Sequence, residues 1–259
     1  MVVDSLLIKQ LSVEIEKKQL LHNIDLNLKT GDLCVICGKN GAGKTTLLKT
    51  LMHHFSTKIT AGTITFNRQK INLLKTSDIA HLGFFFIPQH SCELPGIQTL
   101  AFLKTLNSSL KNPLPFDQLF NHVHQTLKTL ALPEDILTRN LNVNFSGGQR
   151  KKTEILQASI AHPKVWLVDE IDAGLDVDSL KHISKYLQQV RNQSIILIIS
   201  HNNQFIKTLK PNKVIVLNEG KITLTGDQKI IDLIEKNGYE MLGKKTQKNN
   251  NGICNILKK

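Results

Sequence analysis

The sequence predicts an α/β fold with a parallel core sheet, an antiparallel β subdomain and a helical insert. Three observations favour this class. Short apolar runs rich in β-branched residues recur along the 259-residue chain with helical patterns between them, which is typical of a parallel sheet covered by helices. The amino-terminal segment alternates and turns like short strands. A stretch near the middle of the chain shows helical periodicity without β-branched runs.

In the first part of the chain, strands are expected on both sides of a turn, followed by a glycine-rich segment. Residues 6–13 and 20–28 predict two amino-terminal strands, with a turn at 30–32. The apolar run 33–37 predicts a buried strand, and residues 46–52, which follow the glycines, predict a helix.

The run 33–37 also contains a C-x-x-C pair, Cys34 and Cys37. No second pair stands at zinc spacing, and four cysteines are too few and too scattered for a disulfide framework. We therefore interpret the two thiols as buried strand residues rather than as a metal or redox pair.

The second part of the chain continues the alternation. Residues 165–168, 195–199 and 214–217 predict buried strands, and a late hairpin turns at 218–220. Between the first two of these strands, a helix is expected to begin at Ser179 as its cap.

The helical insert is expected between about residues 97 and 162. Within it, apolar residues recur at helical spacing behind Asp117 as a cap; they are Leu119, Phe120, Val123, Leu127 and Leu130.

The glycine-rich segment after 33–37 carries the clearest chemistry. Residues 38–45 fit G-x-x-x-x-G-K-[ST] between a strand and a helix. Such a loop turns backbone N–H groups inward, and the helix dipole adds positive charge, so the pair binds phosphates. Lys44 would neutralise the β- and γ-phosphates, and Thr45 would ligate Mg²⁺. The expected nucleotide-binding residues are Gly38, Lys39, Asn40, Gly41, Ala42, Gly43, Lys44, Thr45 and Thr46.

Two carboxylates end the strand predicted at 165–168. The carboxyl edge of a parallel sheet brings Asp169 beside the phosphate loop, where it would hold the Mg²⁺ shell. Glu170 is placed to accept a hydrogen bond from an attacking water.

A second anion site is expected at Phe145-Ser146-Gly147-Gly148-Gln149, ahead of a basic helix start. Ser146, Gly147 and Gly148 would bind phosphate at the helix amino terminus. One molecule cannot easily present both anion sites to a single nucleotide. We therefore expect an ATP-dependent head-to-tail dimer, in which each copy gives this segment to the other's ATP.

These motifs resemble those of the ATP-binding cassette (ABC) ATPases, whose signature L-S-G-G-Q the chain matches at four of five positions. The resemblance implies ATP and Mg²⁺ as ligands and hydrolysis to ADP and phosphate. Gln89 is similar to the glutamine that senses Mg²⁺ and water, Asp176 to a loop that crosses the dimer interface, and His201 to the histidine that contacts the γ-phosphate. By this resemblance the catalytic residues are Glu170, His201 and Gln89, and the metal-binding residues are Thr45, Gln89 and Asp169. Since residues 13–17 lack the aromatic residue that often stacks on adenine, Val13 or Ile15 is expected to hold the base.

Within the superfamily, several segments resemble the SufC-like ATPases of iron–sulfur cluster assembly; they are 94–97, 154–157, 169–176 and 238–242. This resemblance implies SufB-like and SufD-like scaffold proteins as partners and a cytoplasmic or organelle-stroma location. Since no internal repeat is present, we expect one ABC ATPase domain over 1–242, with a helical subdomain at about 97–162. A basic Lys- and Asn-rich tail then covers 243–259.

Composition leaves two rival function classes. Hydrophobic residues make up 41% and charged residues 21%, which excludes wholesale disorder, and no apolar run approaches the roughly 18 residues of a membrane span. The ATPase motifs alone would also suit the nucleotide-binding subunit of a membrane transporter. The net charge of +12 invites a nucleic-acid-associated ATPase, but the single Trp and two Tyr offer little stacking for bases.

Overall fold

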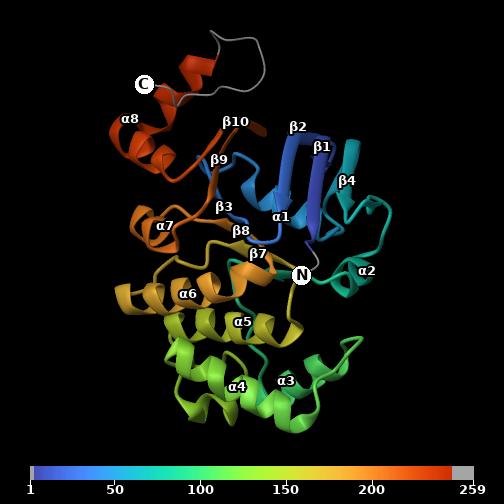
Figure 1. The fold of residues 1–259 in the computed structure, drawn as a ribbon, viewed down its shortest axis with the longest axis vertical. Coiled ribbons are helices and arrows are strands. Elements are labelled where there is room, and N and C mark those ends of the chain that lie inside the picture. The colour runs from blue at the N-terminus through green and yellow to red at the C-terminus, as the bar shows by residue number, and fades with distance from the viewer. Residues whose placement is uncertain (1–2, 247–259) are drawn as a thin grey trace.

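Two β-sheets organise the computed structural model, which describes residues 3–246 (Figure 1). The smaller sheet is antiparallel and runs in the order β2-β1-β4-β5. Its strands are β1 (Ser5–Ile15), β2 (Lys18–Lys29), β4 (Lys58–Phe66) and β5 (Gln69–Lys70). The predicted amino-terminal strands are therefore confirmed as an antiparallel subdomain.

The larger sheet has the order β10-β9-β3-β8-β7-β6, and all neighbouring strands except β10 and β9 pair in parallel. Its strands are β3 (Leu33–Cys37), β6 (Phe84–Ile87), β7 (Val165–Asp169), β8 (Ile195–Ile199), β9 (Lys213–Asn218) and β10 (Lys221–Gly226). Every residue of β3, β7 and β8 is buried, because helices and the smaller sheet cover both faces. This burial explains why these strands are continuous apolar runs instead of alternating patterns.

Strand β3 supplies side chains to two separate hydrophobic cores. Leu33, Val35 and Cys37 pack with the helices around β7 and β8, whereas Cys34 and Ile36 pack against the smaller sheet. Successive side chains of a strand point to opposite faces, so Cys34 and Cys37 cannot share a metal ion. No cluster of three metal-ligating side chains exists among the described residues. The interpretation of both thiols as buried strand residues is confirmed.

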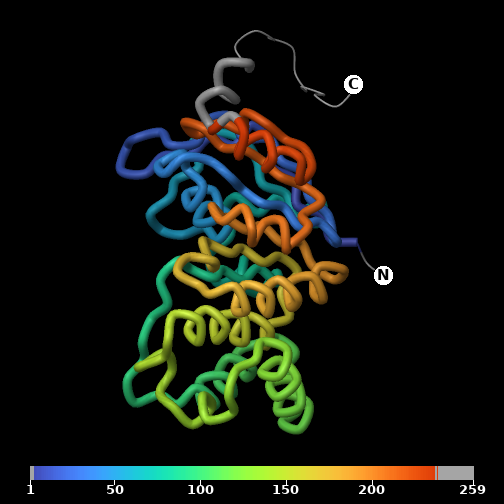
Figure 2. The backbone as a smooth tube through the Cα atoms, turned by 90° about the vertical axis from the view of Figure 1, so that its left-hand side faces the viewer, coloured from blue at the N-terminus to red at the C-terminus, as the bar shows by residue number. Residues whose placement is uncertain are grey.

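Helices cover the larger sheet, and a group of them between β6 and β7 forms the lower end of the molecule (Figure 2). This group comprises α3 (Thr99–Ser108), α4 (Phe116–Leu130), the short 3₁₀ helix Glu134–Leu137 and α5 (Gly147–Ala161). The predicted helical insert is thereby confirmed. The other helices are α1 (Lys44–Leu51), α2 (Thr76–His81), α6 (Val177–Val190), α7 (Asn203–Leu209) and α8 (Lys229–Thr246).

Two predicted helix caps are wrong, and one residue of the predicted apolar pattern is partly exposed. Helix α4 begins at Phe116 with Pro115 as its N-cap, so Asp117 lies inside the first turn. Phe120 is 40% exposed and stacks on the neighbouring Phe116 ring instead of entering the core. Helix α6 begins two residues before Ser179, because the Asp176 side chain accepts a hydrogen bond from the Ser179 backbone N–H.

The carboxyl-terminal part contains the predicted hairpin and a kinked helix. Strands β9 and β10 pair around the turn at Glu219 and Gly220, and α8 bends at Gly238, where φ is 65°. Residues 247–259 of the predicted basic tail lie outside the described residues. Within residues 3–246, no helix combines the length and apolar character needed to cross a membrane.

A core substitution tests the two-sided burial of the sheet. Leu167→Ala in β7, where Leu167 is fully buried, should lower the free energy of unfolding by about 2–5 kcal/mol because it leaves a cavity. Leu73→Ala, at a position 96% exposed, is the matched control and should change it by less than about 0.5 kcal/mol. Urea unfolding followed by circular dichroism measures both, and equal effects would contradict the packing described.

Candidate functional site

The predicted phosphate loop joins β3 to α1 and is fixed by close backbone contacts. Gly38 has φ 147°, and a Cβ there would lie 2.1 Å from the Leu217 carbonyl oxygen of β9. The Ala42 carbonyl accepts a hydrogen bond from Gly220 N–H at 3.1 Å. Gly43 caps α1 in the left-handed region with φ 97°. Glycine is required at 38 because the loop must lie directly against the strand beside it.

Lys44 lies inside this loop. Its ammonium donates to the carbonyl oxygens of Gly38 and Lys39, both at 2.9 Å, and the residue is only 5% exposed. Burial lowers the pKa of Lys44, and the nearby carboxylates of Glu170 and Asp169 act in the opposite direction. The side chain is thus a buried cation in a ring of backbone dipoles, which suits binding to a polyanion.

Thr45 and Asp169 are brought together from the helix and the sheet. Thr45 Oγ1 donates to Asp169 Oδ1 at 3.2 Å, although 124 residues separate them in sequence. Asp169 ends β7 and is 1% exposed, and burial raises its pKa. A hydroxyl and a buried carboxylate beside the phosphate loop are hard oxygen donors of the type that Mg²⁺ prefers. These residues therefore fit a bound Mg²⁺.

Two of the three predicted catalytic side chains, Gln89 and His201, contact the third, Glu170. Gln89 Nε2 donates to Glu170 Oε2 at 2.6 Å, and His201 Nε2 lies 3.3 Å from Glu170 Oε1. They come from segments after β6, β7 and β8, so the carboxyl ends of three neighbouring parallel strands assemble them. Gln89 contacts Glu170 in this arrangement, whereas the Thr45–Asp169 pair forms a separate contact.

Glu170 has a strained backbone, and a hydrogen bond and a nearby buried side-chain pair stabilise it. Its φ is 45°, in the left-handed region that costs a non-glycine residue about 1–2 kcal/mol, and its N–H donates to Ile199 O at 3.1 Å. Two residues on, buried Asp172 accepts a hydrogen bond from Ser200 Oγ at 2.9 Å, and burial raises the Asp172 pKa. Strain of this kind persists where the surroundings hold it and is frequent at active sites.

The predicted second anion site lies at the amino terminus of α5. Ser146 Oγ accepts from Gln149 N–H at 3.2 Å, and Gln149 Oε1 accepts from Ser146 N–H at 3.0 Å, which is a capping box. A Cβ built on Gly147 would meet no atom within 4 Å, whereas one on Gly148 would lie 3.0 Å from Ser179 Oγ. The helix terminus is therefore open at Gly147.

This second site belongs to a different part of the molecule from the phosphate loop. Helix α1 packs on β2, β4, β7 and β8, whereas α5 packs on α3, α4, α6 and β6. Both carboxylate oxygens of Asp176 accept hydrogen bonds from Ser179, one from its backbone N–H and one from its hydroxyl, both at 2.8 Å. The geometry thus groups Asp176 with the signature segment and not with Lys44.

Sequence reasoning missed the burial of the lysines that follow the signature. Lys151 is 7% exposed, and its ammonium donates to the carbonyl oxygens of Pro88 and Gln89. Burial lowers its pKa. Lys151 therefore ties α5 to the segment that carries Gln89. The signal was the basic run 150–152, because three consecutive helical residues span about 200° of the helix circumference and cannot all face water.

One of the two residues expected to hold adenine is buried. Val13 is 0% exposed and packs in the core of the smaller sheet, so its side chain is inaccessible to a base. Ile15, two residues further along β1, is half-buried. The pairing of β1 is irregular around residues 11–14, where three consecutive residues are buried, and Val13 lies in the core there, which corrects that half of the expectation.

A family model described as "ABC transporter" matches residues 21–173, more than half of the chain. The chain belongs to the ABC family of ATPases. Accordingly, it binds ATP and hydrolyses it.

Two relatives show where this ABC ATPase lies within the family. It is 37% identical over 246 residues to "Probable ATP-dependent transporter ycf16" of Antithamnion sp., covering 92% of this chain and 97% of that protein. It is 34% identical over 241 residues to "Probable ATP-dependent transporter SufC" of Escherichia coli K12, covering 91% and 97%. The resemblance to the SufC-like ATPases is confirmed.

Solved structures confirm the fold. An ATP-binding cassette solved as a dimer in a post-hydrolysis state with ADP and Pi superposes with a TM-score of 0.72 at 20% identity, over 86% of this chain and 98% of that one.

Thiol chemistry tests the placement of β3. Burial raises the pKa of both Cys34 and Cys37 to about 12, whereas Cys92 is exposed. Since the thiolate is the reactive form, a maleimide at neutral pH should label Cys92 and leave Cys34 and Cys37 unmodified until the chain is unfolded. Mass spectrometry of peptides measures this. Rapid labelling of Cys37 in the folded protein would contradict the structure; Cys254 lies outside the described residues.

Proposed function

We propose that this ABC ATPase drives an iron–sulfur cluster assembly scaffold made of SufB-like and SufD-like partners. The observation that supports this most directly is the Ile171-Asp172 pair after Glu170, a choice that resembles the SufC-like ATPases. Asp172 lies buried under the catalytic candidates and is bonded to Ser200. The relative named SufC, similar over 91% of the chain, supports the same assignment.

In the proposed reaction, water attacks the γ-phosphate in line while the protein positions the groups and neutralises charge. Lys44 would exchange its bonds to the Gly38 and Lys39 carbonyls for bonds to phosphate oxygens. Thr45 and Asp169 would hold Mg²⁺, which when bound neutralises charge on the β- and γ-phosphates. The expected role of Gln89 in sensing that ion remains part of this proposal.

Glu170 would act as the general base. Its two carboxylate oxygens face Gln89 and His201, so both side chains can orient it toward the attacking water. His201 would in addition contact the γ-phosphate.

The nucleotide would be held between two copies of the chain arranged head to tail. The phosphate loop of one copy and the segment Ser146-Gly147-Gly148 of the other would enclose the ATP, with Asp176 at the interface. Two features support this: the open helix terminus at Gly147 and the dimer reported for the solved cassette. ATP favours the paired state only to the extent that it binds that state more tightly.

We propose further that residues 1–242 form one ABC ATPase domain, that residues 97–162 form its helical subdomain, and that residues 243–259 form a basic tail. The location proposed is the cytoplasm or the stroma of an organelle.

A second candidate function is the nucleotide-binding subunit of a membrane transporter. The names of both relatives contain the words "ATP-dependent transporter", and the two functions share the ATPase machinery. They differ in the partner: a pair of scaffold proteins in one case and a membrane-embedded protein in the other.

Removal of the proposed base should separate binding from hydrolysis. Glu170→Gln keeps the shape of the side chain but cannot take a proton, so turnover should fall on the order of a hundredfold or more while ATP still binds. Phosphate release and nucleotide-binding titrations measure the two effects. Glu16→Gln, in an exposed turn, is the matched control, and unchanged turnover in Glu170→Gln would remove Glu170 from this role.

A charge at the second anion site tests the dimer. In the Glu170→Gln background, ATP with Mg²⁺ should double the mass measured by light scattering. Adding Gly147→Asp should abolish the doubling, because its carboxylate would repel the partner's phosphates. The variant should remain folded, since Gly147 is open and an acid in the first helical turn is favourable. Ser109→Asp, after α3, is the control; a dimer that persists with Gly147→Asp would contradict the arrangement.

Partner identity decides between the two functions. The chain, purified with a tag from its native source, should bring down two scaffold proteins without membrane spans, and ATP hydrolysis should change when they are added. Recovery of a membrane-embedded partner in stoichiometric amount would instead support the transporter function.

A further inference from the structure

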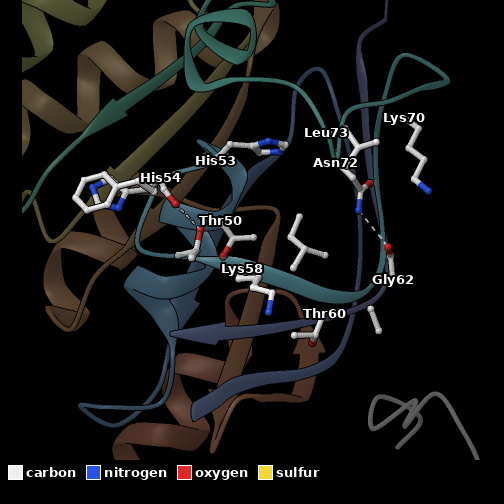
Figure 3. Close-up of a pocket in the computed structure, with 13 residues that line it drawn as sticks. Thr50, His53, His54, Lys58, Thr60, Gly62, Lys70, Asn72 and Leu73 are labelled. Carbon is white, nitrogen blue, oxygen red and sulfur yellow. Dashed lines mark hydrogen bonds between the residues drawn. The ribbon is translucent and has the colours of Figure 1, made fainter. Parts of the chain in front are cut away.

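A pocket of roughly 460 Å³ lies on the antiparallel sheet, at the end of α1 opposite the phosphate loop (Figure 3). Three segments line it: residues 58–62 of β4, the end of α1 with the loop that follows it, and the end of β5 with the residues after it. Five consecutive residues of β4 take part. Because side chains alternate between the faces of a strand, a pocket lined by consecutive residues also faces the backbone along the strand's edge.

The edge of β4 at this pocket lacks a neighbouring strand. On one side β4 pairs with β1, from Lys58 to Phe66. On the other side β5 pairs only with Thr65 and Phe66. In the part of the chain described, no strand pairs with that second edge over residues 58–61. Such an edge presents backbone N–H and C=O groups to any extended chain that approaches.

Asn72 marks where the open edge ends. Its Nδ2 donates to Gly62 O at 3.1 Å (Figure 3), and its Oδ1 accepts from Ile64 N–H at 2.8 Å. The side chain thus satisfies the backbone groups between the open edge and β5, as a short piece of strand would. The remaining stretch of four residues is about 13 Å long.

Two large apolar side chains flank the edge in full contact with water. Phe55 is 93% exposed and Leu73 is 96% exposed, the highest values among the large apolar side chains whose exposure the structure describes, and both line the pocket. Edge strands that are protected from pairing carry charges, prolines or bulges; here the charge is Lys58, which is paired with Glu14 of β1, and the irregular pairing lies on the β1 side of β4. Exposed apolar groups beside an open edge are instead typical of a surface that another chain covers.

The lining is basic. Lys58, Lys70, His53 and His54 contribute to it, and no Asp or Glu does. Lys58 is already paired with Glu14 at 2.6 Å, and burial lowers the pKa of His53, so the positive charge that an occupant would meet is mainly that of the exposed Lys70. Charge complementarity therefore favours an acidic occupant.

We propose that the edge of β4 over residues 58–61 binds an extended segment of a protein partner, in which acidic and apolar residues alternate. The segment would add to the sheet as a strand, with its apolar side chains against Phe55 and Leu73 and its carboxylates near Lys70. In this mode of recognition, backbone hydrogen bonds provide affinity and side-chain contacts provide selectivity. None of these residues belongs to the ATP site, so the proposal is independent of the iron–sulfur function.

The test uses the full-length chain and a fluorescein-labelled peptide of alternating Glu and Val, about six residues long so that it covers the four-residue edge with a residue to spare at each end. Fluorescence anisotropy should show saturable binding, and a Lys-Val peptide of the same length should bind at least about tenfold more weakly. The double variant Phe55→Ser with Leu73→Ser, and separately Lys70→Glu, should each weaken binding of the acidic peptide by about tenfold. Phe116→Ser, at a position 56% exposed on α4, is the control and should bind as the unmodified chain does.

Amide hydrogen exchange provides the readout specific to strand addition. The bound acidic peptide should slow exchange within residues 58–61, because the added strand protects their backbone groups. Circular dichroism and ATP hydrolysis should be unchanged in all variants, since Phe55, Leu73 and Lys70 are exposed and lie outside the ATP site.

Four results would overturn the proposal: equal binding of the two peptides, no binding of the acidic peptide, unchanged affinity in the double variant, or protection confined to other segments. Sedimentation with phosphatidylserine vesicles tests the competing explanation, that the surface binds a membrane. If the chain binds these vesicles, loses that binding in the double variant and does not bind the peptide, the surface is a membrane contact instead.

Discussion

The burial of β3 on both faces is the constraint on which the rest of the ATP site depends. Its side chains alternate between two hydrophobic cores, so the strand can neither slide nor tilt without opening one of them. The strand ends directly at Gly38, where the chain turns against the backbone of Leu217. The phosphate loop therefore takes its position from core packing, and its few internal hydrogen bonds set only its local shape.

The parallel order of the sheet explains the assembly of the carboxylate cluster. Strands β6, β7 and β8 end at the same edge, so Gln89, Glu170 and His201 meet although they are far apart in sequence. The left-handed backbone of Glu170 turns its side chain toward the other two and leaves Asp169 with Thr45. This backbone strain persists because the hydrogen bond to Ile199 and the buried Asp172–Ser200 pair stabilise the turn.

The phosphate loop and the segment at Gly147 differ in how much of a binding site each forms within one chain. The phosphate loop has its cation, its carboxylate and its hydroxyl within one chain. The helix terminus at Gly147 faces outward with open space, and Lys151 connects its helix to the Gln89 segment. A nucleotide held between two copies would therefore contact α5 of one of them. Through Lys151, a shift of α5 would also move the segment that carries Gln89. The open edge of β4 is separate from the contact between α5 and the Gln89 segment. It lies at the carboxyl-terminal end of α1, whereas the phosphate loop lies at the amino-terminal end.

The sequence by itself determined the strands that are buried on both faces and the motif whose function depends on a fixed local spacing. Strands β3, β7 and β8 were predictable because burial on both faces demands unbroken apolar runs, and residues 38–45 because a phosphate loop needs glycine and lysine at set spacing. Tertiary structure decided what depends on neighbours: which face of β1 carries Val13, that Lys151 is buried, and that Phe120 faces water. The cap of α6 is a local choice between two suitable residues, in which Asp176 is the N-cap and accepts a hydrogen bond from the Ser179 N–H. For Val13, Lys151 and Phe120 the residue type suits either environment, and only the presence or absence of packing against distant segments selects one.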